Sequence, residues 1–362
     1  MLDGKNWHLQ RIRPTSTMVS PVNTQVLPRE YGDIRLLRTL DIDSKGMNGV
    51  AFAADGQTLF TGNENGTAQL WSVNDGTLLH TFGDSDRSIV SVGYSPDGQV
   101  LATGMGSGAV ILVGVDGTVL QTMQNHSAEI NSVVFSPDGK ILASGSDDGL
   151  VSIWQVSDGT LLRTLGVAHA GGITSLSFSP DGQLLASGSY NGNITLWNVS
   201  TGELIYMLEG KHTNFVMSVA FSPDGQTLAA GFEDGAITLW HASDGTVLRT
   251  LEGHSMTVWS LVFTPDGQML VSGSSDNTID FWRLSDGSLF RTLQGHTDVV
   301  YKISFSYNGE MLASAKSGWH CATLEDSSLN IPVSWSMKKD FGQKARNLQL
   351  AIYKDNSCGC IL

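Results

Sequence analysis

The 362-residue sequence predicts an all-β fold, a β-propeller of seven four-stranded antiparallel blades. The first observation behind this prediction is a repeat with a spacing of 41 to 43 residues, marked by an aromatic residue at Phe52, Tyr94, Phe135, Phe178, Phe221, Phe263 and Phe305. The second is that each repeat contains four short strand-like segments. The third is that Asp-Gly or Asn-Gly turns, which supply the positive φ of tight hairpins, separate these segments.

Residues 124–165 form the clearest copy of the repeat. Its predicted strands are INSVVF, ILASGS, LVSIWQV and TLLRTL, and the turns between them are SPDG, DDG and SDG. Small or apolar side chains occupy both faces of these strands, so each sheet must be packed between two neighbours. Radial stacking of the repeats around one axis satisfies this requirement.

One propeller domain is expected over residues 31–336, after a flexible lead-in over residues 1–30 and before a divergent tail over residues 337–362. The repeats within it span 41–82, 83–123, 124–165, 166–208, 209–251, 252–293 and 294–336.

The two ends of the propeller are expected to share one sheet. A fourth-strand segment precedes the first repeat at residues 33–40, whereas the last repeat has no clear copy of that segment. The N-terminal strand Ile34 to Leu40 should therefore complete the sheet begun by residues 294–314 and so remove exposed sheet edges.

The last repeat loses its pattern after Ser314, where Gly318 and Leu324 replace the expected turn Asp and strand Trp. Its third strand could come from NIPVSWSM, which contains Trp335, although Pro332 disfavours a central strand. Residues 346–353, NLQLAIYK, could instead supply an edge strand. The third possibility is an incomplete last blade.

Composition excludes several classes of protein. The net charge of −14 argues against nucleic-acid binding and suits a basic protein or peptide partner, although the charge could serve solubility alone. The sequence contains no run of about 18 apolar residues, so it predicts no membrane-spanning helix.

The cysteines, Cys321, Cys358 and Cys360, all follow the clear repeats. Gly359 stands where a prenylation signal needs cysteine. We expect a cytoplasmic monomer.

The motif GH…FSPDG…LASGS…D…W at fixed offsets resembles the WD40-repeat family over roughly residues 33–314. The resemblance implies a hydrogen-bonded His, Ser, Asp and Trp set within each blade. Two repeats supply complete sets: His126, Ser144, Asp148 and Trp154, then His254, Ser272, Asp276 and Trp282. Other repeats depart from it, with Ala230 in place of the hydroxyl in repeat five and Asn191 in place of the carboxylate in repeat four.

These histidines are predicted to have a structural role rather than a catalytic or metal-binding one. Their spacing of 42 to 43 residues from His126 to His296 places one on each successive blade, so they cannot converge on one metal ion. Each serine lies in a strand rather than on a nucleophile elbow. We therefore predict no metal site, no cofactor and no enzymatic activity. The alternative is a propeller-based enzyme or small-ligand binder that uses the central channel.

The resemblance also implies which positions face a partner. In such blades, the loop before the first strand and the turn between the second and third strands form the top face. There the later repeats carry the larger side chains, which we predict to bind a protein or peptide: Tyr190, Phe215, Met217, Glu233, Trp259, Val299 and Tyr301. Glu129 and Asp147 would extend an acidic flank. The competing interpretation is that the aromatic side chains fold down and plug the channel.

Overall fold

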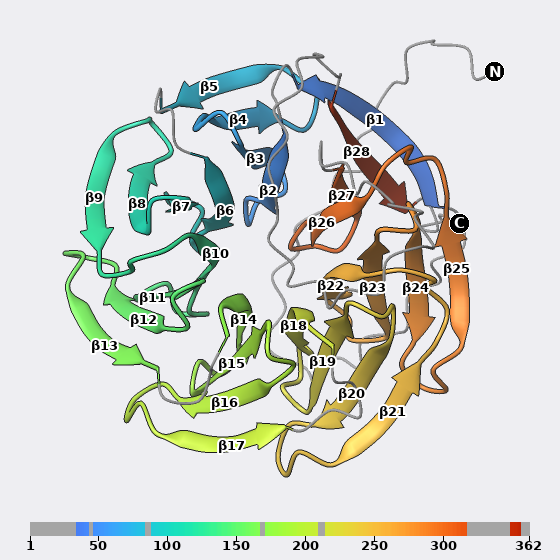
Figure 1. The fold of residues 1–362 in the computed structure, drawn as a ribbon. Helices are drawn as coiled ribbons and strands as arrows, with labels where there is room; N and C mark the ends of the chain where they lie inside the picture. Colours follow the sequence, from blue (N-terminus) through green and yellow to red (C-terminus); the bar gives the residue numbers. More distant parts are fainter. Residues whose placement is uncertain are drawn as a thin grey trace, which may run out of the picture.

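The computed structural model describes residues 34–42, 46–83, 88–166, 171–208, 214–316 and 348–355. Seven four-stranded antiparallel sheets surround a common centre, as Figure 1 shows. The prediction of an all-β propeller with four-stranded antiparallel blades is confirmed. No helix in the described part of the chain is long and apolar enough to cross a membrane.

Six blades each consist of four consecutive strands, ordered from the centre outward. Blades one to three are β2–β5 (Met47–Phe52, Thr58–Asn63, Ala68–Ser72, Leu78–Phe82), β6–β9 (Ile89–Tyr94, Val100–Met105, Ala109–Gly114, Val119–Gln124) and β10–β13 (Ile130–Phe135, Ile141–Ser146, Val151–Gln155, Leu161–Leu165). Blades four to six are β14–β17 (Ile173–Phe178, Leu184–Ser189, Ile194–Asn198, Leu204–Leu208), β18–β21 (Val216–Phe221, Thr227–Phe232, Ile237–His241, Val247–Leu251) and β22–β25 (Val258–Phe263, Met269–Ser274, Ile279–Arg283, Leu289–Leu293).

The remaining sheet combines both ends of the described chain, and we call it the closing sheet. Its order is β26 (Val300–Phe305), β27 (Met311–Lys316), β28 (Leu348–Asp355) and β1 (Ile34–Ile42). β1 therefore lies outermost, the place expected for the N-terminal strand.

The expectation of an edge strand over residues 346–353 needs correction, because the observed strand is β28 at Leu348–Asp355. β28 pairs with β27 on one side and with β1 on the other, so it is an interior strand rather than an edge strand. A propeller boundary at residue 336 is therefore wrong, because part of the expected tail belongs to the sheet. The competing segment NIPVSWSM lies outside the described residues.

Burial follows the position of each strand. In blade three, the two inner strands β10 and β11 have no exposed residue, whereas the outer strand β13 exposes four of its five residues. Turn chemistry ends the strands: Gly139 adopts a φ of 71°, and the Asp138 carboxylate accepts the Lys140 N–H at 3.1 Å. The same Asp138 oxygen accepts the Ser136 hydroxyl at 2.7 Å. The small turn residues thus satisfy the backbone where pairing stops.

Neighbouring blades are joined by serine hydroxyls near the axis. The innermost strands contact one another in the order β2, β6, β10, β14, β18, β22, β26 and back to β2. Five of them carry serine at the third position: Ser91, Ser132, Ser175, Ser218 and Ser260. Each hydroxyl accepts an N–H from the next innermost strand at 3.0–3.2 Å, from Val133, Leu176, Val219, Leu261 and Ile303. We call this set the serine ladder.

Removing one hydroxyl of the serine ladder should destabilise the fold. Ser175→Ala leaves the buried Val219 N–H without its acceptor, so we expect the free energy of unfolding to fall by about 1–3 kcal/mol. Urea denaturation followed by tryptophan fluorescence measures the change. The matched control is Ser157→Ala in an exposed turn, and equal midpoints for the two variants would contradict the structural role of the ladder.

Candidate functional site on the top face

The His126 set of blade three links three parts of one blade. His126 Nε2 lies 2.9 Å from the Ser144 hydroxyl, which also accepts the Trp154 indole N–H at 2.8 Å. His126 Nδ1 lies 3.1 Å from the Asp148 carboxylate. Burial lowers the pKa of His126, although Asp148 opposes this shift. The set therefore joins the entry loop, the tight turn and the third strand.

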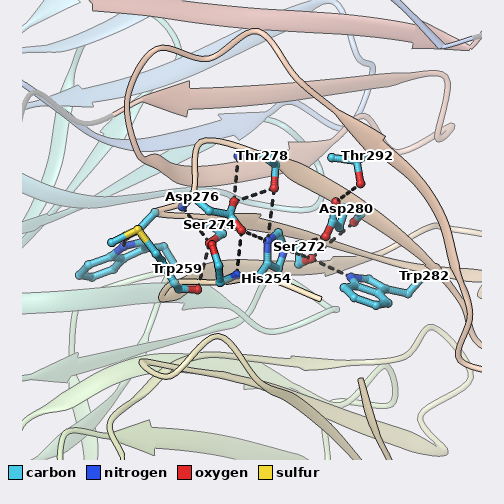
Figure 2. Close-up of polar contacts among 12 residues, drawn as sticks. His254, Trp259, Ser272, Ser274, Asp276, Thr278, Asp280, Trp282 and Thr292 are labelled. Carbon is cyan, nitrogen blue, oxygen red and sulfur yellow. Dashed lines mark hydrogen bonds and ion pairs between the residues drawn. The ribbon is translucent and has the colours of Figure 1, made fainter. Parts of the chain in front are cut away.

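In blade six, the equivalent His, Ser, Asp and Trp side chains belong to a larger network, shown in Figure 2. His254 Nδ1 lies 2.8 Å from Asp276, and His254 Nε2 lies 2.7 Å from the Ser272 hydroxyl, which accepts the Trp282 N–H at 2.8 Å. A second carboxylate, Asp280, approaches His254 Nε2 at 3.6 Å.

The pKa values of the two carboxyl groups in this network are shifted in opposite directions. Burial acts to raise the pKa of Asp276, but hydrogen bonds from His254 and Thr278 outweigh it and leave the pKa well below its ordinary value. Burial raises the pKa of Asp280, and the hydroxyl of Thr292, which donates to it at 2.6 Å, only partly opposes that shift.

The other repeats keep parts of the set. The Trp71 N–H reaches the Thr61 hydroxyl at 3.1 Å, and the Trp197 N–H reaches the Ser187 hydroxyl at 2.8 Å. Trp240 is buried opposite Leu228, beside Ala230, which offers no hydroxyl. His169, His212 and Asp43 lie outside the described residues.

A repeated backbone hydrogen bond builds the top face. In six blades, the residue before the tight-turn Asp or its equivalent donates its N–H to a carbonyl of the entry loop at 2.8–3.0 Å. The donor and acceptor pairs are Glu64 and Gly46, Gly106 and Ser88, Asp147 and Glu129, Tyr190 and Gly172, Glu233 and Phe215, and Ser275 and Thr257. Because main-chain atoms make this bond, the side chains at these positions are free to vary.

The predicted aromatic residues meet in two pairs. Trp259 of blade six and Tyr301 of the closing sheet have ring centroids 4.9 Å apart, and the Trp259 N–H donates to the Ser275 hydroxyl at 2.6 Å. Tyr190 of blade four and Phe215 of blade five meet edge to face at 5.3 Å. Four consecutive sheets thus contribute to one aromatic sector.

These side chains differ in their exposure. Phe215 is 36% exposed, whereas Met217 is only 7% exposed. Trp259, Tyr190, Tyr301 and Val299 are half-buried, and Glu233 is exposed. Burial, together with Asp147 and Glu129, raises the pKa of Tyr190 to about 12, so its hydroxyl stays protonated at neutral pH.

A small cavity of about 20 Å³ lies among side chains of the aromatic sector. Its lining consists of Asn131, Thr174, Tyr190, Met217, Trp259, Tyr301 and Lys302. It therefore brings together Tyr190, Met217, Trp259 and Tyr301 of the predicted partner-binding set, but not Phe215, Glu233 or Val299. A space of this size holds roughly one water molecule.

Sequence reasoning did not single out Lys302. Its position holds serine in five repeats, and that contrast was the available signal. No group of three or more His, Cys, Asp or Glu side chains in the described ranges is arranged to hold a metal ion.

Comparison with known proteins identifies the family. The family model described as the first β-propeller of IFT122 matches residues 88–285, more than half of the chain. The model described as WD domain, G-beta repeat matches residues 34–72 and 287–327. No curated protein matches the chain. The chain belongs to the WD40-repeat family of β-propellers, whose members are typically protein-interaction scaffolds.

Replacing each carboxylate of blade six by an amide should affect the free energy of unfolding differently. Asp276 has a lowered folded-state pKa, so its contribution to stability is complete at neutral pH and declines as pH falls below about 4. Asp276→Asn should therefore lower the free energy of unfolding by about 1–3 kcal/mol at neutral pH, with a smaller loss in acid.

Asp280 has a raised pKa, so its ionised form is disfavoured in the folded state at neutral pH. Asp280→Asn keeps an acceptor for Thr292 and should leave the protein at least as stable as wild type at neutral pH. Urea midpoints at several pH values test both variants. A larger loss for Asp280→Asn than for Asp276→Asn would contradict the assigned shifts.

Proposed function

We propose that this protein is a non-enzymatic interaction scaffold whose top face binds a peptide or protein segment. The observation that carries the proposal is the aromatic sector, in which Trp259 packs on Tyr301 and Tyr190 packs on Phe215 across four consecutive sheets. Aromatic side chains that share a cavity with buried Met217, with few charges among them, resemble the centre of a protein interface.

Electrostatics favour a basic residue in the partner. Glu129 and Asp147 contribute to raising the pKa of Tyr190 and Tyr301, which means that their negative charges act on the cavity that these two tyrosines line. Exposed Glu233 adds a further carboxylate beside Phe215. A cationic side chain placed near these aromatic rings would gain both ion-pair and cation–π attraction.

We also propose that the closing sheet is the seventh blade and that the ring is closed. Support comes from β26, which contacts β22 on one side and β2 on the other. A closed ring would hold the top-face loops in fixed relative positions, so binding would require little ordering of the scaffold. We propose further that the protein acts as a cytoplasmic monomer.

Selection from a random peptide library tests the proposed binding face. Peptides that bind the wild-type protein should bind the Trp259→Ala, Tyr301→Ala double variant at least 100-fold more weakly, because truncating two central anchors removes roughly 3 kcal/mol or more. Affinities are measured by fluorescence anisotropy and folding by thermal unfolding.

The matched control is Tyr307→Ala, which removes an aromatic ring that is 80% exposed in the turn between β26 and β27. This variant should bind as wild type does. Peptides that bind all three proteins equally would refute the proposed face, and a large fall in the melting temperature of the double variant would mean that the two rings serve the core.

A further inference from the structure

Lys302 interrupts the serine ladder. It occupies the third position of β26, where five other innermost strands have the serine that accepts the next strand's N–H. Val50 holds the corresponding donor position in β2. An ammonium group has three donors and no acceptor, so Lys302 cannot accept the Val50 N–H as a serine hydroxyl would.

The lysine also carries an electrostatic cost. It is half-buried, and burial lowers the pKa of its ammonium group. Within the described part of the chain, no carboxylate forms an ion pair with Lys302, and burial is the sole influence on its pKa. A residue that weakens the fold locally without compensation is the kind that binding sites contain.

Lys302 lines the cavity together with two other donors. Tyr190 and Tyr301 line the same space, and the two phenols lie close enough for Tyr190 to influence the pKa of Tyr301. Both pKa values are raised, so both hydroxyls remain donors at neutral pH. None of these three groups donates to an acceptor among the residues that the structure describes.

Charge is unevenly distributed around the cavity. The carboxylates of Glu129 and Asp147 act on both tyrosines and Glu64 acts on Tyr301, whereas burial alone lowers the pKa of Lys302, which follows Tyr301 along β26. Negative charge thus gathers near the tyrosines, and the single positive charge of the cavity lies one residue further along the innermost strand.

We propose that the cavity at Lys302 binds a carboxylate, held by the lysine ammonium and the Tyr190 and Tyr301 hydroxyls. This inference rests on the proposed function in one respect: the carboxylate is supplied by the segment bound on the top face, either as an acidic side chain or as a chain terminus. Three side chains that carry hydrogen-bond donors, one of them charged, line this one cavity, and charge-assisted donors recognise a carboxylate most strongly. The cavity admits only the tip of such a group, so the rest of the segment remains on the aromatic sector.

Sodium acetate tests the site without any partner. The protein is labelled with ¹³C at the lysine Cε positions, and the Lys302 resonance is assigned by its loss in Lys302→Ser. Titration at constant ionic strength should shift this resonance saturably, with an affinity about tenfold higher for acetate than for neutral acetamide. Equal effects of acetate and acetamide, or no saturable shift, would overturn the proposal.

Two variants separate loss of binding from loss of folding. Lys302→Ser restores the ladder residue and should melt no lower than wild type, and Lys302→Met keeps the chain length without charge. Both should lose the difference between acetate and acetamide in the Trp259 and Tyr301 ring resonances, whereas Lys140→Ser, at an exposed lysine beside Asp138, should keep it. Retention of the difference in both Lys302 variants would assign the carboxylate site elsewhere.

Peptides from the library selection distinguish the source of the carboxylate. Amidation of the terminus, or replacement of acidic side chains by amides, should weaken binding to wild type about tenfold but leave binding to Lys302→Met unchanged. If Trp259 and Tyr301 are needed for binding and Lys302 is not, the carboxylate proposal fails while the proposed function stands. If acetate binds at Lys302 but the double variant still holds its peptides, the proposed function fails alone.

Discussion

The structure depends on hydrogen bonds between the innermost strands of adjacent blades. A propeller has no single core: each sheet buries its two faces against its neighbours, and apolar packing alone does not fix the angle between two sheets. The serine ladder supplies a directional contact at five of these junctions, each between a hydroxyl and a buried N–H. At the junction of β26 with β2, Ser304 provides a longer contact of 3.4 Å to the Phe52 N–H.

Stability within a blade and variation on its top face are separable. The His126 and His254 sets fix the entry loop to the tight turn beneath the surface, and a main-chain bond then fixes the two loop positions that reach the surface. Because the bond uses no side chain, one blade can present Glu129 and Asp147 while another presents Phe215 and Glu233. The repeat thus keeps one backbone arrangement while the side chains on its top face vary from blade to blade.

The sequence predicted the features that recur and failed where the chain departs from its own repeat. Spacing was enough to predict the four-stranded blades, and the resemblance to WD40 repeats implied the partners of His126 and His254. It could not place residues 348–355, because β28 enters the closing sheet after a long segment that lacks the repeat pattern. Lys302 escaped notice because it lies within an otherwise ordinary strand, and only alignment of the third positions reveals it. The pairing of Trp259 with Tyr301 depends on the distance between blades, which sequence does not give.

The composition of the closing sheet has a consequence for the order of folding. Ile34 pairs with Asp355, so the first described strand leaves the ribosome hundreds of residues before its partner β28. Blades one to six can each assemble from adjacent strands as they are synthesised, whereas β1 must wait without a sheet neighbour until β28 has emerged. Until then the unpaired edge of β1 is the segment most exposed to wrong pairing.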